Sequence, residues 1–528
     1  MRQISLLLCL CLGSLMYAQQ PDAAASAARK LTEVIYNVER YYVDAPNTAQ
    51  ISDAAIVALL EELDPHSTYI PKEELDDAQM QINGSFVGIG VRFQLVKDTI
   101  SVVATIPGGP SEKLGILPGD QIVMVDNKNV AGIGIKNNDV RQKLMGDLGT
   151  KVKVTVNRKG KLVDFNITRD KIPVFSVDAA YMIDKEIGYI KLNSFSRTTV
   201  QEVQNALQDL KSQGMKSLIF DLQGNGGGLL DAAHKLADEF LSGDKLIVYS
   251  EGRAQPRSDL KAAKNGMFEK GQLILLTDEY SASASEILSG AIQDWDRGLI
   301  VGRRSYGKGL VQRPMPLSDG SEMRLTIARY YTPTGRHIQK PYQDTETYRK
   351  DLNQRYLNGE FFLKDSIKMP DSLMFHTLKT KRVVYGGGGI MPDVFVPLDT
   401  TENSTYFSEV IRGGHVNSFA FQYINAHRAE LKNTYPQFID FKNNFNLDGQ
   451  FMDEFFAYIE KEAPAIEFDA EQYATSESLL KLRLKAVIAQ DLWGTNEMFQ
   501  IYNDTNEILQ KAIEVIESKQ YNQFELDK

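Results

Sequence analysis

Residues 277–312 are the stretch that most constrains how this 528-residue chain can fold. An apolar run at 273–276 comes just before it and is short enough to be a buried strand. A small, polar turn at 281–285 follows. Beyond the turn, apolar side chains recur at helical spacing, which predicts a helix that ends near Gly298. A second apolar run at 299–301 predicts another strand, so the stretch predicts an α/β unit.

Two residues of this stretch have the chemistry of a nucleophile and its base. Ser283 lies in the polar turn, where the start of a helix would offer N–H groups to a developing oxyanion. Lys308 lies between Gly307 and Gly309 in an apolar setting that favours the neutral amine, which can accept a proton from serine. Gln312 is four residues further on. In an extended segment it would face the same way and could hold the lysine by a hydrogen bond.

Spacing alone leaves three other interpretations open. Ser283 and Glu286 fit a capping box, in which the serine only caps its helix. The spacing of Gly302 and Lys308 is close to that of a phosphate-binding loop, although Gly309 stands where Ser or Thr should hold magnesium. Finally, the lysine could be an ordinary surface residue in a turn.

The sequences SASASE at 281–286 and GKGLVQ at 307–312 resemble the catalytic signature of the C-terminal processing peptidases, also called tail-specific proteases. The resemblance implies that Ser283 is the nucleophile, Lys308 the general base and Gln312 the residue that orients the lysine. The two flanking serines would then be structural. It also implies a crotonase-like fold for the catalytic core.

A glycine-rich loop at 225–228 follows a predicted buried strand. Such a loop could cradle a phosphate, but no Lys-Ser or Lys-Thr pair follows it. In the peptidase family a similar glycine pair supplies one oxyanion donor, and the amide after the nucleophile supplies the other. The resemblance therefore implies Gly227, with Gly228 as the alternative, together with Ala284. The family usually has proline where Gly226 stands, so the choice of glycine stays open.

Residues 84–171 are rich in predicted strands and resemble a PDZ domain. Such a domain adds a peptide tail as an extra strand and holds its terminal carboxylate with the amides of a glycine-rich loop. Gly88, Ile89 and Gly90 match that loop by position. A small β-domain with an ordinary glycine turn is the alternative, against which the sequence LPGD at 117–120 argues.

The predicted fold is α+β and multidomain: an α/β crotonase-like catalytic core with an inserted PDZ domain and helical N- and C-terminal regions. We expect a signal peptide at 1–18, an N-terminal helical region at 19–83, a peptidase core at 172–400 and a C-terminal helical extension at 401–528. The signal's apolar run is too short to span a bilayer. Within the core, residues 339–380 lack clear periodicity, which predicts an insertion or lid.

Composition narrows the chemistry. The formal net charge of −10 argues against a nucleic-acid partner. Both cysteines, Cys9 and Cys11, lie in the predicted signal, so the mature chain would have no disulfide, thiol nucleophile or cysteine metal site. His66 follows Asp64-Pro65, which predicts a turn rather than a catalytic histidine. We expect no metal, no organic cofactor and no stable membrane insertion.

The resemblance implies an exported serine endopeptidase, periplasmic or extracytoplasmic after signal cleavage. It would recognise protein substrates with free C-termini through its PDZ domain and cut internal bonds with a Ser–Lys dyad. The helical regions are candidates for a homodimer contact. The alternative is a non-catalytic protein that binds peptides or apolar ligands on the same fold, and the intact set of Ser283, Lys308 and Gln312 argues against it.

Overall fold

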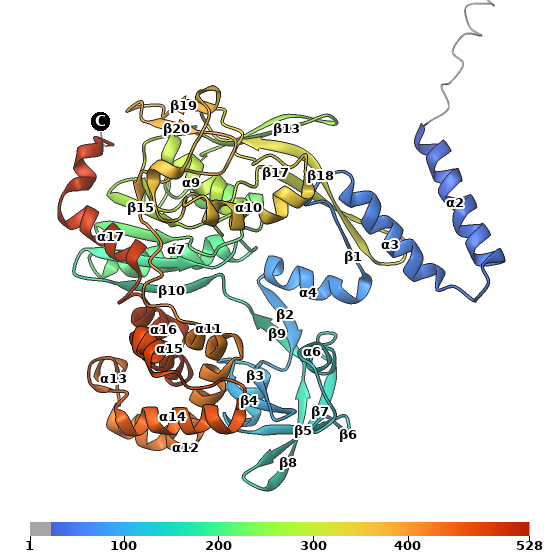
Figure 1. Ribbon diagram of the computed structural model, residues 1–528, viewed down its shortest axis with the longest axis vertical. Helices are drawn as coiled ribbons and strands as arrows, with labels where there is room; N and C mark the ends of the chain where they lie inside the picture. Colours follow the sequence, from blue (N-terminus) through green and yellow to red (C-terminus); the bar gives the residue numbers. More distant parts are fainter. Residues whose placement is uncertain (1–22, 264, 527–528) are drawn as a thin grey trace, which may run out of the picture. The chain divides into compact units, whose positions relative to one another are not determined.

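The computed structural model describes residues 23–263 and 265–526 (Figure 1). The predicted signal peptide lies outside the described residues. The chain forms two compact units. Among the described residues, the first comprises 23–75 together with 312–326, and the second comprises 76–263 and 265–311 together with 327–526.

The first unit is mainly helical. It contains α2 (Ala23–Tyr41), α3 (Thr48–Glu61) and the strand β1 (Thr68–Ile70), which pairs antiparallel with residues 322–324 of β18 (Glu322–Tyr331). The turn expected before β1 is present, because the Asp64 carboxylate accepts the N–H groups of His66 and Ser67 at 2.8 and 2.9 Å. No residue of α2 is buried. Its amphipathic face is therefore uncovered within this unit.

A six-stranded antiparallel sheet occupies the segment predicted as a PDZ domain. Its order is β3 (Val91–Val96), β4 (Thr99–Thr105), β5 (Gln121–Val125), β7 (Lys151–Arg158) and β8 (Lys161–Thr168), with the short β6 (Lys128–Asn129) beside β5. Two helices, α5 (Pro110–Leu114) and α6 (Asn137–Leu144), pack on it. The strands β2 (Ser85–Gly88) and β9 (Asp170–Pro173) pair where the domain joins the chain. Alternate residues of β7 and β8, such as Val152, Val154 and Ile167, form the buried core.

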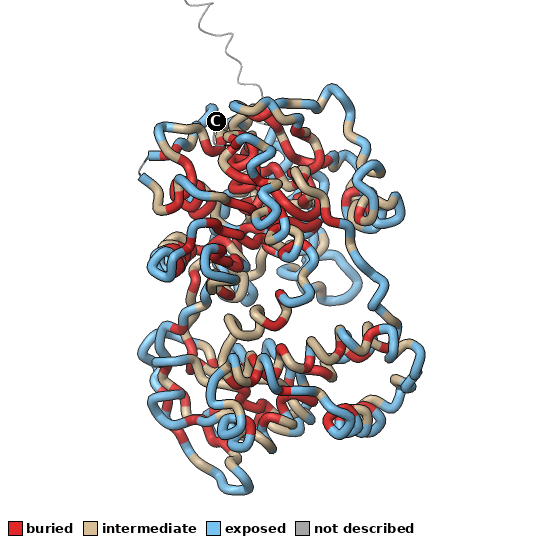
Figure 2. The backbone as a smooth tube through the Cα atoms, turned by 90° about the vertical axis from the view of Figure 1, so that its left-hand side faces the viewer, coloured by how far each residue is buried: buried red, intermediate tan, exposed pale blue. Residues whose placement is uncertain are grey.

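The segment predicted as the peptidase core is built on a mostly parallel sheet. Its order is β10 (Val177–Met182), β11 (Ile187–Leu192), β12 (Ser217–Asp221), β15 (Gln272–Thr277), β16 (Leu299–Gly302) and β21 (Val394–Phe395), with only β10 antiparallel. Every residue of β11 and β12 is buried, as expected for parallel strands covered on both faces. Figure 2 shows buried and exposed residues along the backbone. The loops after β12, β15 and β16 therefore meet at one edge of the sheet, where ligands of such sheets bind.

Helices cover the two faces of this sheet. On one face lie α7 (Thr199–Ser212), α8 (Leu230–Ala237) and α9 (Ala284–Asp294). On the other, α17 (Glu507–Glu517) packs Ile508 and Ala512 against strand residues such as Ile274. The last helix of the predicted C-terminal extension thus belongs to the core of the sheet.

The second unit contains further sheets and helices. A smaller antiparallel sheet contains β13 (Leu246–Gly252), β14 (Gln255–Lys261) and the end of β18. The segment 339–380, for which no periodicity was found, contains α10 (Thr345–Leu357) and β19 (Met374–His376), which pairs with β20 (Val383–Tyr385). The helices of the C-terminal region share an aromatic core of their own; they are α11 (Thr405–Arg412), α12 (His415–Thr434), α13 (Phe438–Asn444), α14 (Gly449–Glu462), α15 (Ala470–Leu492) and α16 (Thr495–Tyr502).

Candidate active site

Ser283 lies at the sharp turn between β15 and α9 and is the N-cap residue of α9. Its backbone has φ 56° and ψ −110°, a left-handed conformation that is unfavourable for a residue with a side chain. Strain of this kind persists only where the surroundings hold the residue in place, and it is common at functional sites. The side chain of Ser283 is partly exposed, whereas the following residues of α9 are buried.

The two flanking serines have structural contacts. Ser281 Oγ donates to the carbonyl of Leu222 at 2.8 Å, and Ser285 Oγ donates to the carbonyl of Asn225 at 2.9 Å. Both serines are fully buried. Their hydroxyls attach the turn to the neighbouring glycine-rich loop, so Ser283 is the one serine of the three that a substrate could reach.

Lys308 lies in the loop after β16. Gly307 has φ 89°, and a Cβ there would lie 3.1 Å from the amide nitrogen of Gly389. A Cβ on Gly309 would lie 2.9 Å from the amide nitrogen of Gln339. Both glycines are therefore required by close backbone packing, which fixes the path of the chain on either side of the lysine.

The buried carboxylate of Glu286 joins the nucleophile turn to the lysine loop. Its Oε2 accepts the N–H of Ser283 at 2.8 Å and the N–H of Lys308 at 2.9 Å. Its Oε1 accepts the N–H of Gly307 at 2.7 Å and the hydroxyl of Ser305. Burial raises the pKa of Glu286, and these hydrogen bonds oppose the rise. One side chain thus fixes the backbone of both predicted catalytic residues.

Tyr330 of β18 provides a second link. Its hydroxyl lies 3.1 Å from the carbonyl oxygen of Ser283 and hydrogen-bonds to the carbonyl of Lys308. Burial, followed by the nearby Glu286, holds the pKa of Tyr330 well above its usual value, so the hydroxyl stays protonated. The two loops are therefore braced by a carboxylate that accepts from their N–H groups and a hydroxyl that reaches their carbonyls.

The glycine-rich loop lies against the nucleophile turn. A Cβ on Gly227 would lie 2.7 Å from the carbonyl oxygen of Ala282, 2.8 Å from Cβ of Ser283 and 2.9 Å from the amide nitrogen of Ala284. The two predicted oxyanion amides, Gly227 and Ala284, therefore belong to backbone segments in direct contact. The Gly227 N–H also donates to the side-chain oxygen of Asn225 at 2.8 Å. To serve as an oxyanion donor it must share or exchange that hydrogen bond.

Gln312 belongs to the first unit. Its side-chain amide donates to the carbonyl of His66 in the same unit. The part predicted for Gln312 in orienting Lys308 stays a prediction.

The predicted carboxylate-binding loop at 88–90 precedes β3, an edge strand of its sheet. In its sheet β3 pairs with β4 and lies at the end of the strand order, and its side chains Arg92 and Gln94 contact Asp491 and Ser418 of the C-terminal helices. Gly90 has φ 74°, and a Cβ there would lie 3.0 Å from Ile172 Cδ1. Ser111 donates to the carbonyl of Ile89 through its hydroxyl at 2.6 Å and its N–H at 3.1 Å. These contacts fix the loop from behind.

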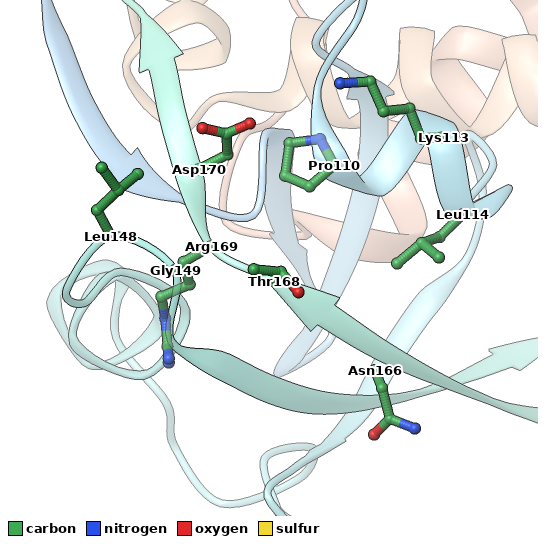
Figure 3. A pocket seen from close by; sticks show the side chains of 9 residues that line it. All are labelled: Pro110, Lys113, Leu114, Leu148, Gly149, Asn166, Thr168, Arg169 and Asp170. Carbon is green, nitrogen blue, oxygen red and sulfur yellow. The ribbon is translucent and has the colours of Figure 1, made fainter.

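A cavity of about 580 Å³ lies in the PDZ domain beside α5 (Figure 3). Its walls come from α5, from the loop at 148–149 and from the junction of β8 with β9. Arg169 lines it, and the Arg169 guanidinium donates to the carbonyls of Lys143 and Leu144 at the end of α6. Arg169 therefore stabilises the C-terminal end of that helix.

Within the described residues there is no group of three or more His, Cys, Asp or Glu side chains arranged to hold a metal ion. In the same part of the chain, no helix has the length and apolar character needed to cross a bilayer.

Three family models match the chain. Residues 186–346 match peptidase family S41, residues 87–168 match a PDZ domain, and residues 406–494 match a family of unknown function named DUF8443. A peptidase core and a PDZ domain define a serine-type peptidase of modular build.

Curated relatives narrow the class. The "Carboxy-terminal-processing protease" of Bartonella bacilliformis is 37% identical over 314 residues, which are 58% of this chain and 71% of the relative. The "Carboxy-terminal processing protease CtpA" of Bacillus subtilis is 34% identical over 330 residues, covering 62% and 70%. Among solved structures, a photosystem II D1 C-terminal processing protease is 26% identical, with 69% and 92% of the chains covered and a TM-score of 0.35. The chain belongs to the C-terminal processing peptidases of family S41.

Sequence reasoning missed three side chains of this site. Glu286 was considered only as a helix-cap partner, although its carboxylate also accepts the Lys308 N–H. Tyr330 lies in β18, outside the motifs that predicted the site, and nothing in the sequence around it marks its hydroxyl. Asn225 was predicted only as part of a glycine-rich loop. Its Nδ2 donates to the carbonyl of Leu192, which holds the loop on the sheet.

Proposed function

We propose that this chain is an exported serine endopeptidase that recognises protein C-terminal tails through its PDZ domain and cuts internal peptide bonds with a Ser283–Lys308 dyad. The observation that carries the proposal is the bracing of these two residues. Glu286 and Tyr330 contact the backbone of both, while the side chains of the neighbouring serines hold the strained turn in place.

The mechanism follows from these roles. Lys308, as the neutral amine, takes the proton from Ser283 Oγ while Oγ attacks the carbonyl carbon of the scissile bond. Gln312 orients the amine. The protonated lysine then donates to the leaving amine, which breaks the peptide bond and leaves an acyl-enzyme. Water hydrolyses that ester with the lysine again acting as base.

The amides of Ala284 and Gly227 stabilise the oxyanion of each tetrahedral intermediate. Ala284 is the first residue of α9, where the helix dipole favours negative charge. The Gly227 N–H is paired with Asn225 in the absence of substrate, and the developing charge of the oxyanion is the stronger acceptor. No step requires a metal or an organic cofactor.

The PDZ domain selects substrates by their ends. The amides at Gly88, Ile89 and Gly90 hold a free carboxylate, and the edge of β3 takes the preceding residues as a strand. We favour a gating role, in which the domain restrains the catalytic site until a tail arrives, over a role as a simple tether.

The finer features of the prediction also belong to this proposal. The core is crotonase-like, the leader at 1–18 directs export, and the mature chain acts in the periplasm or another extracytoplasmic space. A homodimer through the helical regions is supported by α2, which exposes Leu31 and Val34.

Replacing each serine of the turn separates an enzyme from a binding protein. Ser283→Ala should abolish hydrolysis of an unfolded protein, a loss of about 10⁴-fold or more, because the nucleophile is removed. Ser281→Ala and Ser285→Ala should retain turnover while lowering the free energy of unfolding, by about 1–3 kcal/mol for each lost buried hydrogen bond.

Rates from gel-based cleavage and melting temperatures should be measured for all three variants. Equal cleavage by wild type and Ser283→Ala would favour the non-catalytic alternative. If Ser285→Ala alone lost turnover, the nucleophile would be Ser285 and the assignment to Ser283 would be wrong.

A further inference from the structure

One buried charge beside the lysine loop takes no part in the proposed reaction. The lysine loop comprises residues 303–309, which follow β16. Arg355 of α10 (labelled in Figure 1) is 3% exposed. Tyr348 is also buried, and the other residues of this helix are partly or fully exposed. Because arginine is almost never fully buried unless its donors are paired, the contacts of the Arg355 guanidinium explain its position.

Arg355 holds two consecutive carbonyls of the lysine loop. Its Nη2 donates to the carbonyl of Arg304 at 2.7 Å, and its Nη1 donates to the carbonyl of Ser305 at 3.1 Å. A guanidinium is planar and presents its donors in a fixed fork, so it fixes the two carbonyls relative to each other. Lys308 lies three residues beyond Ser305. The arginine therefore sets the path by which the chain reaches the predicted base.

The second half of the loop has contacts of its own. Glu286 accepts the N–H groups of Gly307 and Lys308. Tyr330 hydrogen-bonds to the Lys308 carbonyl. Those contacts fix the peptide groups next to the base, and Arg355 fixes the peptide groups that lead to it. Helix α10 thus supports the site from a segment in which the sequence has no clear periodicity.

The buried position is unfavourable for the charge of Arg355. Burial, followed by the neighbouring Arg304, lowers the pKa of Arg355 to about 10. The Glu360 carboxylate pairs with both guanidiniums, since it lies 3.3 Å from Arg355 Nε and hydrogen-bonds to Arg304. Apolar residues of similar volume often stabilise a fold more than buried charges do. A helix that had only to be attached to the core could use such residues, so the guanidinium indicates a need for its two carbonyl contacts.

We propose that Arg355 is a positioning residue for the general base: by holding the carbonyls of residues 304 and 305, it fixes the lysine loop and with it the amine of Lys308. The inference rests on the proposed function, because the amine has to be placed only if it takes the proton from Ser283. A tail bound by the PDZ domain makes no use of this amine. Loss of the Arg355 contacts should therefore lower kcat and leave KM unchanged.

Steady-state kinetics on the full chain, with a labelled unfolded protein as substrate, measure this effect. Arg355→Met removes the guanidinium at similar length and should lower kcat about 50-fold. This loss is smaller than the roughly 100-fold expected for a displacement of about 1 Å, because Glu286 and Tyr330 still hold the loop. Arg355→Lys keeps the charge but concentrates its donors on one atom, Nζ, so its kcat should recover to within about fivefold of wild type.

Arg297→Met is the matched control. The Arg297 guanidinium also donates to carbonyls, those of Phe240, Phe268 and Gly271, at 3.0, 2.7 and 2.9 Å. Arg297 and Gly271 lie just before β16 and β15, so this contact is at the opposite edge of the core sheet from the lysine loop. The control variant should lower the melting temperature and leave kcat unchanged.

Hydrogen exchange gives a readout that needs no hydrolysis. Amides of the lysine loop should exchange about tenfold faster in Arg355→Met, because the loop opens more often without the arginine. Arg297→Met should leave exchange in this loop at the wild-type rate. Mass spectrometry of proteolytic peptides that cover residues 303–311 measures both rates.

The inference is overturned if Arg355→Met keeps wild-type kcat, if Arg297→Met loses kcat to the same extent, or if exchange in the lysine loop is unchanged. If Arg355→Met does not fold, the comparison is made with Arg355→Lys, where a wild-type kcat has the same meaning. The proposed function fails separately. A wild-type chain that cleaves nothing would contradict the peptidase, whereas an active wild type whose kcat does not depend on Arg355 would contradict this inference alone.

Discussion

The glycine-rich loops of the peptidase core and of the PDZ domain both present backbone N–H groups to a negative charge, but they are supported differently. In the core loop, the Gly224 N–H donates to the buried Asp278 carboxylate at 2.9 Å. The side-chain amide of the fully buried Asn225 donates a hydrogen bond to the carbonyl of Leu192. In the PDZ loop, Ser111 supports Ile89 through a hydrogen bond to its carbonyl, and the strand that follows, β3, lies at the edge of its sheet.

The difference follows from the charge that each loop would meet. An oxyanion exists only in the transition state and its neighbouring intermediates, so its donors must be rigid before the reaction starts. A peptide tail is a stable ligand that enters as a strand, so its site needs an accessible edge. Changes around the core loop should therefore reduce kcat. Changes in the PDZ loop should reduce the preference among substrate ends.

The largest effect is expected at the base. Lys308→Arg and Lys308→Ala should both lose about 10³-fold or more in kcat, because arginine keeps the charge but does not become a neutral base. Wild-type kcat should rise with pH as the lysine loses its proton. Steady-state rates across a pH series check both points, and appreciable activity in Lys308→Arg would reduce the lysine to a structural role.

The next largest effect is expected for Glu286→Gln, which should lower kcat about 100-fold. A loss of this order is expected when reacting groups are misplaced by about 1 Å. Glutamine would present an NH₂ group to backbone N–H donors that the carboxylate now accepts, from Ser283 and Lys308 or from Gly307.

Glu239→Gln is the matched control for this change. Glu239 is also a buried carboxylate that accepts backbone and side-chain donors, but it lies at the end of α8, away from the nucleophile turn. Glu239→Gln should lower the melting temperature and leave kcat unchanged. A similar loss of kcat in both variants would mean that Glu286 acts only through general stability.

A smaller effect, of about tenfold, is expected from the PDZ loop. A peptide with a free end should be cleaved faster than the same peptide with an amidated end, because amidation removes a charged acceptor. Gly90→Ala should abolish this difference, since a Cβ there strains the backbone and meets Ile172. Gly108→Ala is the control. Gly108 also has a positive φ, 73°, but a Cβ there would meet no atom within 4 Å, so this variant should keep the rate difference between the two peptides. Equal rates for both ends on the wild type would refute carboxylate recognition.

Deletion of residues 84–171 distinguishes a PDZ domain that restrains the catalytic site from one that only tethers the substrate. If the domain restrains the catalytic site, the deletion should raise the basal rate on a peptide with an amidated end. If it is a tether, the deletion should lower the rate on free-ended substrates and leave the amidated peptide unchanged. Both rates come from one progress-curve experiment on the intact and shortened chains.

The strand–turn–helix around Ser283 could be predicted from sequence because its signals are local. The strand at 272–277 and the helix at 284–294 lie where apolar runs and helical spacing predicted them. The contacts that join Ser283 to Lys308 could not be predicted this way. They depend on Glu286 reaching a loop about twenty residues away and on Tyr330 of another strand, which are matters of tertiary packing.

Two helices show the same limit. The helix α10 was missed because only Tyr348 and Arg355 are buried along it, so it has almost no hydrophobic periodicity. The helix α17 was predicted as part of a separate extension, but it covers one face of the core sheet. A buried parallel sheet requires cover on both faces, and sequence pattern alone does not say which distant segment supplies it.

The smallest expected effect is a pH dependence of stability that arises from the charged residues supporting the core loop. Asp178 of β10 lies near Lys191, and the Lys191 ammonium is 3.2 Å from Asp221 Oδ1 and donates to the carbonyl of Gln223, just before Gly224. Burial raises the pKa of Asp178 to about 6; Lys191 lowers it, and Asp221 and Glu202 raise it further. The hydroxyl that supports the PDZ loop, that of Ser111, is a neutral group.

The direction of the pH effect follows from that shift. In the unfolded chain Asp178 should titrate near its usual pKa of about 3.9, so the folded chain holds this proton more tightly. The stabilisation is complete below pH 4 and is lost as pH rises through about 6. Asp178→Asn does not titrate, so its melting temperature relative to wild type should increase between pH 4.5 and 7.5, whereas an exposed control on α7, Asp209→Asn, should give a constant difference. A difference for Asp178→Asn that stays flat or shrinks over this range would show that the carboxyl is not buried as described, and that the core loop is no more sensitive to pH than the PDZ loop.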